Sequence, residues 1–467
     1  MMPGACFRSF VFSFACLVGS TFLFSSCASL NQSTYERPQL SFAPNWYGSA
    51  SKGMLSALPS WWVAFGDPAL NHLVDKAMKA NRDLATAVLS LRQAKLQVDI
   101  AREQGYPTLA AGISSSVSRS FKAPKTTTHE AGTSLSVSWQ LDLWGNIADQ
   151  VDAAEWEARA TDQDRFAVAM TVSSEVADDY WQLALIADQI DLNRKTIEYD
   201  EQTLRLVQCR HDIGVATAID ILAAKQTLSA AERNRSELEN ELVQTSNSLS
   251  ILVGDPVGTA YSVEARVLNQ TPPDIPVGVP ADILSRRPDV KAAELRLRES
   301  LRDVDVTRTS FYPTLGLTGA GGTSSEALRN LLQNPAGSIV ASIAFPFLDA
   351  WTMNSQIASS RISYDEQVVA FKRSFYQALV DVENALSSVG DYNAQIVQLQ
   401  QAVEYANESK HAYAMQYEVG TVPLQTLLDA DEAAHNAVSS LSSARYRLVV
   451  SEVALMVALG GTVDLPQ

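Results

Sequence analysis

Side chains that could perform acid–base or metal chemistry occur along this chain, but their spacing gives little support for an enzyme. The chain has five histidines among 467 residues, and none stands in a metal-ligand spacing such as His-Glu-x-x-His. Asp178-Asp179 and Asp188/Asp191 are carboxylate pairs, which we expect on the solvated faces of long helices. No glycine-rich phosphate loop precedes an expected helix. We therefore expect no catalytic residue, no metal site and no cofactor.

Cys27 is the residue with the clearest chemical role. Residues 9–26 are almost all apolar or small, and Arg8 is the only charge before them, which is typical of a secretory signal peptide over 1–26. The small residues before Cys27 resemble a bacterial lipoprotein cleavage site, at which the cysteine becomes the lipidated first residue. We expect a covalent lipid such as palmitate on Cys27. An uncleaved membrane anchor and plain secretion are the alternatives.

The charge balance argues against nucleic acid as a partner. The formal net charge is −16 and the isoelectric point is near 4.8, whereas binding to phosphates requires a basic surface. After the signal peptide, no run of ~18 apolar residues predicts a transmembrane helix.

An internal repeat organises the chain. Residues 83–109 and 289–315 align at an offset of 206 positions without a gap, and both copies close on Tyr-Pro-Thr-Leu. Proline lacks an N–H and disfavours helix in the residue before it, so each helical pattern ends there. Repetition on this scale predicts duplicated architecture. We expect a lipid-anchored extended leader over 27–66, a first repeat over 67–260, a linker over 261–280 and a second repeat over 281–467.

After each Tyr-Pro the pattern changes from helical to alternating. Residues 134–143 alternate polar and apolar side chains, which is typical of a strand with one apolar face. With a polar loop expected over 122–132, residues 108–143 form a predicted β-hairpin. The second repeat is expected to form a hairpin over 312–348, in which apolar residues alternate as far as Phe347. Each strand has ~9–12 residues, the length that crosses a bilayer when tilted.

Long helical hairpins are predicted after each pair of strands, over 146–253 and 352–459. No proline interrupts their outgoing arms, and each arm corresponds to ~100 Å of helix. Gly214 and Gly420 are expected to end these arms in the left-handed conformation. The return arms are shorter than the outgoing arms. We therefore expect the repeated helices, over 83–105 and 288–310, to stack on the ends of the return arms.

The expected strands raise the question of how their sheet closes. A sheet in a membrane must close on itself, because lipid leaves N–H and C=O groups at its edges unsatisfied. Single-chain barrels need at least ~8 strands, and this chain offers two hairpins. If these strands enter a membrane, several copies must share one barrel. An ordinary soluble sheet with one buried face is the alternative.

Taken together, the motifs resemble the TolC-type outer-membrane efflux channel family, in its lipoprotein branch. The resemblance covers nearly the whole chain after the signal peptide. It rests on Trp61-Trp62 through Asp67-Pro68, Asn81–Leu84, Tyr106-Pro107, Tyr312-Pro313, Leu141–Gly145, Arg286–Asp289 and the glycines at 214 and 420. It implies an α plus membrane-β fold, in which a long α-helical coiled-coil barrel continues into a twelve-stranded β-barrel. A homotrimer shares that barrel, each chain giving four strands.

The same resemblance implies a function. It is that of the outer-membrane component of a tripartite RND-type efflux pump, a passive conduit for drugs or other small toxic compounds that underlies multidrug resistance. The implied partners are further copies of the chain, a periplasmic adaptor protein, an inner-membrane pump and outer-membrane lipid, with the helical tunnel in the periplasm. An outlet for secreted polypeptides and a coiled-coil envelope lipoprotein without a pore are the alternatives.

Candidate functional residues follow from the resemblance as well. In similar channels acidic residues after the two turn glycines ring the narrow end of the tunnel. Asp220 and Asp429 follow theirs by six and nine positions, and the repeat does not conserve either acid. We expect a constriction that favours cations, formed by Asp220, Asp429 and Thr426; solvated surface acids are the alternative. The expected adaptor-docking surface consists of Arg210, Gly214, Tyr417, Gly420 and Pro423.

Overall fold

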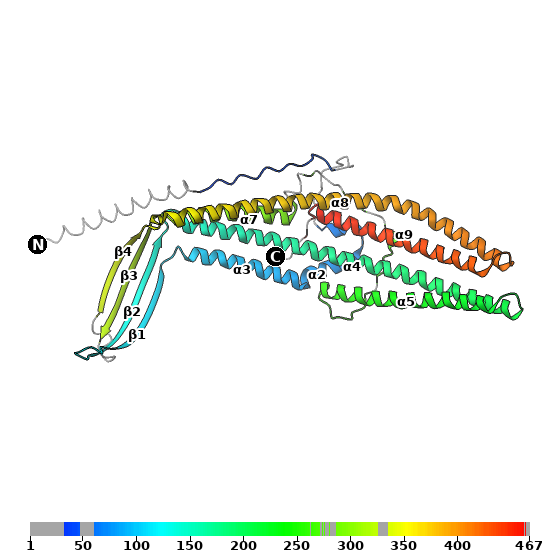
Figure 1. Ribbon diagram of the computed structural model, residues 1–467, viewed down its shortest axis with the longest axis horizontal. Coiled ribbons are helices and arrows are strands. Elements are labelled where there is room, and N and C mark those ends of the chain that lie inside the picture. Colours follow the sequence, from blue (N-terminus) through cyan, green and yellow to red (C-terminus); the bar gives the residue numbers. More distant parts are fainter. Residues whose placement is uncertain are drawn as a thin grey trace. The chain divides into compact units, whose positions relative to one another are not determined.

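The computed structural model describes residues 32–46, 60–261, 263–270, 286–325 and 335–461, and the single positions 273, 275, 280 and 463. The expected signal peptide, Cys27 and much of the expected leader lie outside these residues. The described chain is mostly helical (Figure 1). Its helices are η1 (Trp61–Phe65), α2 (Pro68–Ala80), α3 (Arg82–Glu103), α4 (Asn146–Asp212), α5 (Ala218–Val253), η2 (Val267–Asn269), α7 (Pro288–Thr309), η5 (Pro346–Leu348), α8 (Ala350–Glu418) and α9 (Leu424–Ala458).

The chain forms two compact units that do not coincide with the two repeats. The first unit combines residues 1–40, 90–162 and 292–373, and the second combines 41–89, 163–291 and 374–467. Each unit therefore takes segments from both repeats. The sequence repeat marks duplicated elements, whereas compact packing brings the copies together.

A four-stranded sheet lies in the first unit, with its strands in the order β1-β2-β3-β4 and every neighbouring pair antiparallel (Figure 1). The strands are β1 (Thr108–Arg119), β2 (Thr127–Leu141), β3 (Thr314–Ser325) and β4 (Pro335–Ala344). Successive side chains on a strand point to opposite faces, so the register assigns whole rows to one face. One row consists of Leu109, Val137, Gly319 and Ile339, and the next row, on the other face, of Ala110, Ser136, Ala320 and Ser338.

Besides shifts of about two residues at the end of β2 and the start of β3, two strand boundaries differ from the prediction. β2 begins at Thr127, within the segment expected to be a polar loop, because the ladder continues until Thr127 pairs with Arg119. Backbone hydrogen bonds extend this hairpin through residues whose side chains are exposed. β4 ends at Ala344, although the alternation runs to Phe347, because Pro346 lacks a donor and begins a 3-10 turn.

A segment without regular secondary structure, residues 32–40, binds along α7 in the first unit; we call it the strap. The Ser33 backbone N–H and hydroxyl donate to the Asp305 carboxylate at 2.8 and 2.6 Å. Arg37 forms a bidentate ion pair with Glu294, with donor–acceptor distances of 3.2 and 2.7 Å. Asp305 is fully buried, so the strap covers polar groups of α7 that would otherwise need water.

In the second unit the largest buried side chains surround η1. Trp61 and Trp62 are 1% and 2% exposed, and the Trp61 indole N–H donates to the Ser173 hydroxyl at 3.1 Å. The Tyr180 hydroxyl donates at 2.5 Å to Asp67, and the other oxygen of that carboxylate accepts the backbone N–H of Ala69 at 2.8 Å, at the start of α2. This aromatic core therefore fixes where α2 begins.

The end of α5 meets the start of α3 at a first junction. The Asn81 amide donates to the Leu252 carbonyl at 3.0 Å. The next residue after α5, Gly254, has φ +75°, and a Cβ there would lie 2.8 Å from the Cβ of Ala80. Only glycine fits this left-handed position without displacing the α2 terminus.

The end of α9 meets the start of α7 at a second junction with the same geometry. The Arg287 guanidinium donates to the Ala458 carbonyl at 3.4 Å. Gly460 also has φ +75°, and a Cβ there would lie 2.9 Å from Arg286. The stacking of repeated helices on the return arms, expected from the arm lengths, is thus present at both junctions.

No helix among the described residues has the length and apolar character needed to cross a membrane.

Candidate functional site at the helical turns

The first turn joins α4 to α5 through Gly214. Gly214 has φ +77°, and the backbone N–H groups of Val215 and Ala216 donate to the Arg210 carbonyl at 2.8 and 3.2 Å. These bonds satisfy carbonyl groups that the end of a helix leaves free.

Asp220 has a structural task at this turn. Its carboxylate accepts the backbone N–H and the hydroxyl of Thr217 at 2.7 and 2.8 Å, while the Thr217 hydroxyl accepts the Asp220 N–H at 3.2 Å. This reciprocal capping box begins α5. The acid at this position is therefore accounted for by local folding, whatever it does in conduction.

The second turn differs at the equivalent positions. Gly420 has φ +82°, and the Thr421 N–H donates to the Gln416 carbonyl at 2.9 Å. Pro423 stands at the N-cap of α9 without a side-chain hydrogen bond. Pro423 and Thr426 are the 206-residue counterparts of Thr217 and Asp220. The second repeat therefore lacks both the capping threonine and the acid that pairs with it in the first repeat.

Arg210 and Tyr417 connect the two turns. The Arg210 guanidinium carbon lies 4.5 Å from the centre of the Tyr417 ring, and its terminal nitrogen donates to the Glu418 carbonyl at 2.8 Å. Tyr417 is 5% exposed and belongs to a cluster with Val207 and Leu424. These two residues, predicted as part of one surface, are in contact in the fold.

The structure gives Asp429 different surroundings from those of Asp220. Asp429 is exposed on α9, and its carboxylate accepts the Gln425 amide at 2.6 Å. It lines a pocket whose residues come from α4, α5 and α9, and Asp220 is not among them. Within one chain the two acids therefore do not share a site, and Thr426 is half-buried beside the second turn.

The expectation of solvated carboxylate pairs on α4 is wrong for three of the four acids. One carboxylate oxygen of Asp178 and one of Asp179 are buried without a hydrogen-bond partner. Burial, and then the charge of Asp179, raise the pKa of Asp178 to about 7. Asp188 is 9% exposed and pairs with Arg266 at 3.3 Å. Asp191 is half-buried, and its side chain, 40% exposed, pairs with Arg194 and Lys195.

Two acids that the sequence analysis did not single out are buried on α4 and α9. Asp200 and Asp431 are 1% and 4% exposed, and Asp431 forms an ion pair with Lys410. A comparison of the two repeats could have identified these residues, because their side chains differ from those at the corresponding positions of the other repeat. At an offset of 206 residues, Asp200 corresponds to Ala406, Lys410 to Leu204 and Asp431 to Lys225. No group of three or more metal-ligating side chains is found among the described residues.

Comparison with known proteins gives a family match over both repeats. The family model described as outer membrane efflux protein matches residues 73–255 and 279–461. The pyoverdine export outer membrane protein OpmQ of Pseudomonas aeruginosa is 27% identical over 89% of this chain and 90% of its own length. The toxin and drug export protein A of Aggregatibacter actinomycetemcomitans is 26% identical over 86% of this chain and 88% of its own length.

Solved structures agree with these matches. The chain is similar to the open state of the Neisseria gonorrhoeae MtrE outer membrane channel, with a TM-score of 0.83 and 25% identity. The similarity covers 93% of this chain and 99% of that one. The arrangement of long helices and one four-stranded sheet is therefore the fold of known outer membrane channels.

Proposed function

Because the chain belongs to the outer membrane efflux protein family, we propose that it is the passive conduit of a tripartite efflux system that exports drugs or other small toxic compounds. The family sets the coarse function, which is efflux at the outer membrane. The finer statements concern how copies assemble, what docks at the turns and where lipid is attached.

The face of the sheet is the observation that carries this proposal. Leu109, Ile113 and Ile339 are 69%, 79% and 90% exposed in a single chain, although a stable monomer in water rarely leaves so large an apolar patch uncovered. The register puts Leu109 and Ile339 in one row across the sheet. Lipid is the surrounding that such a face requires.

The edges of the same sheet support a homotrimer. β1 and β4 each pair with one neighbour only among the described strands, so each leaves a row of backbone donors and acceptors open. Lipid cannot satisfy such edges. Three copies would supply twelve strands, which is within the range of closed membrane barrels. The adaptor protein and inner-membrane pump would then engage the turns at Arg210, Gly214, Gly420 and Pro423, while the buried Tyr417 would hold the two turns together beneath that surface.

Planar-bilayer recording of the purified protein tests the conduit directly. We expect discrete conductance steps, and particles with three-fold symmetry in detergent. Protein that inserts into vesicles yet produces no conductance would instead support an envelope lipoprotein without a pore.

The proposed constriction has its own test. We expect Asp429→Ala to reduce the preference for cations, because a ring of carboxylates concentrates cations at a narrow pore. Asp220→Ala is expected to do the same and also to weaken the α5 cap. The matched control is Asp212→Ala, an exposed acid at the end of α4. Unchanged ion selectivity in both variants contradicts the constriction.

Lipid attachment at Cys27 is tested by metabolic labelling. We expect labelled palmitate to be incorporated into the wild-type chain and not into Cys27→Ser. Equal incorporation in the two would refute attachment at this residue.

Export of polypeptides is a second candidate, since the name of one relative includes a toxin as well as drugs. A deletion strain distinguishes the two. Increased sensitivity to toxic small molecules supports efflux, whereas loss of a secreted protein at unchanged sensitivity supports the polypeptide outlet.

A further inference from the structure

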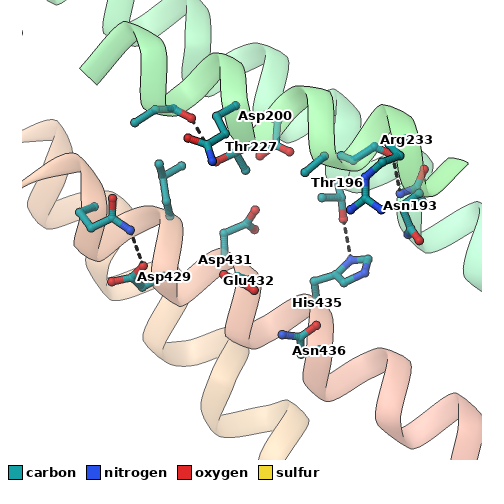
Figure 2. Close-up of a pocket in the computed structure, with 17 residues that line it drawn as sticks. Asn193, Thr196, Asp200, Thr227, Arg233, Asp429, Asp431, Glu432, His435 and Asn436 are labelled. Carbon is teal, nitrogen blue, oxygen red and sulfur yellow. Dashed lines mark hydrogen bonds between the residues drawn. The ribbon is translucent and has the colours of Figure 1, made fainter. Parts of the chain in front are cut away.

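A polar pocket of about 510 Å³ lies within the second unit, with walls from α4, α5 and α9. Figure 2 shows the labelled side chains of α4 and α5 facing those of α9 across this space. Its volume falls in the range of small-molecule sites, about 300–1,000 Å³. Four of its lining residues are acidic: Asp200, Asp429, Asp431 and Glu432.

Asp200 is the unusual member of this group. It is 1% exposed, and neither carboxylate oxygen has a hydrogen-bond partner. A buried polar group without a partner costs about 1–3 kcal/mol, and a charged one more. Burial, and then the charge of Asp431, raise the pKa of Asp200 to about 7. The wall of the pocket therefore contains a buried acceptor that lacks a donor.

The nearby cations do not supply that donor. Lys410 is paired with Asp431 and lies over the Tyr199 ring, with its nitrogen 3.9 Å from the ring centre. Arg233 donates to Glu237 at 2.8 Å. The positive charge near the pocket is thus already engaged.

Asn193 and His435 are two further polar side chains that line the pocket. The Asn193 side-chain oxygen is buried without a partner, while its amide donates to the Ala231 carbonyl at 3.1 Å. His435 contacts the Thr196 hydroxyl through Nδ1 at 3.0 Å, and burial lowers the pKa of His435. A neutral imidazole adds no charge to oppose a cation.

The arrangement fits an organic ammonium better than a metal ion. Among the described residues no three acidic, histidine or cysteine side chains converge as metal ligands. The carboxylates are instead distributed, with Asp200 and Asp431 buried and Asp429 and Glu432 exposed. An ammonium group donates three hydrogen bonds, and an aliphatic chain can carry two such groups from the buried acids to the exposed ones.

We propose that this pocket binds a small aliphatic diamine or polyamine, with one ammonium group on Asp200 and another at the exposed acids of α9. The site lies within one chain, whereas the proposed constriction is a ring of acids from several copies, and Asp429 belongs to both. It goes beyond passive export, because it gives the helical part of the channel a ligand of its own.

Isothermal titration of the purified full-length protein at pH 8 with 1,4-diaminobutane tests the proposal. We expect saturable binding of one molecule per chain, with Asp200→Asn weakening the affinity about tenfold or more, the scale of a charge-assisted hydrogen bond. Glu201→Gln is the matched control. Glu201 is the neighbour of Asp200 in the sequence, and the substitution removes the same negative charge, but from an exposed side chain. Its affinity is expected to stay within about twofold, since exposed ion pairs contribute little. Butylamine, with one ammonium group, is expected to bind less tightly.

A second measurement separates ligand binding from a purely structural role of Asp200. Without ligand, Asp200→Asn is expected to raise the thermal midpoint, because it removes a buried charge without a partner. With the same concentration of diamine, the midpoint of the wild type is expected to rise by more than that of the variant. If Asp200→Asn fails to fold, Glu432→Gln at the exposed rim provides the test, again by weaker binding.

Three results would overturn the proposal. The first is no saturable binding of 1,4-diaminobutane, and the second is equal weakening by Asp200→Asn and Glu201→Gln. The third is binding of Mg²⁺ as tight as that of the diamine, which would indicate a general acidic surface. All three are read in solution, so they are independent of whether the protein conducts.

Discussion

The helices α3 and α7 are copies of one sequence, yet their surroundings differ. Asp305 on α7 is fully buried and accepts hydrogen bonds from Ser33 of the strap and from Arg302 and Arg308. Its counterpart Asp99 on α3 has a side chain that is 62% exposed, and its ion pair with Arg102 is 3.6 Å long. The repeat therefore predicts the same helix twice, while a segment outside the repeat decides which copy is covered.

At the two junctions the relation is reversed, because different side chains make the same kind of contact. Asn81 and Arg287 are 206 residues apart, and each donates to a carbonyl at the end of a return helix. Gly254 and Gly460 share φ +75°. Geometry is conserved between the copies wherever two helix ends meet, even though the donor changes.

Alanine at the junction glycines should have the largest effect. Gly254→Ala and Gly460→Ala are each expected to cost about 3 kcal/mol, combining left-handed strain of about 1–2 kcal/mol with overpacking of about 1–3 kcal/mol. Chemical denaturation in detergent measures both. Gly390→Ala, within α8 where an added Cβ meets open space, should stabilise by up to about 1 kcal/mol. If either junction variant is as stable as Gly390→Ala, the two junctions do not depend on glycine in the same way.

Removing the side-chain donor at each junction should cost different amounts of stability in the two repeats. Arg287 pairs with Asp289 at 2.7 Å and Asp381 at 3.0 Å, so Arg287→Ala should cost about 2–3 kcal/mol by leaving two carboxylates without their partner. Asn81→Ala removes the acceptor of the Asp83 N–H and should cost about 1–2 kcal/mol, the scale of a lost N-cap. The same denaturation assay compares them. Equal costs would mean that the extra ion pairs of Arg287 contribute nothing.

The strap comparison is tested by one substitution in each copy. Asp305→Asn should cost about 1–3 kcal/mol, because a fully buried acceptor of several donors loses its charge. Asp99→Asn should change stability by less than about 0.5 kcal/mol, as exposed sites usually do. Limited proteolysis reports the strap separately: we expect faster cleavage within 32–40 in Asp305→Asn only. Equal cleavage in both variants would contradict the role of Asp305.

The smallest expected effect depends on pH. Glu452 is 2% exposed where the first repeat has Ser246, and burial raises the pKa of Glu452 to about 8. The folded state then holds a proton that the unfolded state has released, so stability falls as the pH rises from about 4.5 to about 8.

Glu452→Gln removes this titration. At pH 8.5 the variant should be more stable than the wild type by about 1 kcal/mol, the lower end of the cost of a buried group without a partner. Between pH 5 and pH 8.5 its thermal midpoint should decline less than that of the wild type. Parallel decline of the two would show that Glu452 does not titrate in this range.

Much of the fold can be predicted from local chemistry. The Tyr-Pro breaks end α3 and α7, the turn glycines end the long helices, and alternation assigns one face of the sheet, because proline geometry, left-handed φ and the strand pleat act within a few residues. The candidate turns were identified for the same reason, and Arg210 does contact Tyr417.

Burial on the long helices required the tertiary structure. Asp200 and Asp191 stand nine residues apart on α4 and look alike in sequence, yet Asp200 is 1% exposed whereas the side chain of Asp191 is 40% exposed. Which side of a helix meets solvent depends on helices contributed by distant parts of the chain, so no local pattern contains it. The sequence by itself determined the elements, their duplication and the family resemblance. Only the tertiary structure decided that the strap covers α7, that Asp220 caps α5 and that Asp200 faces a pocket without a donor.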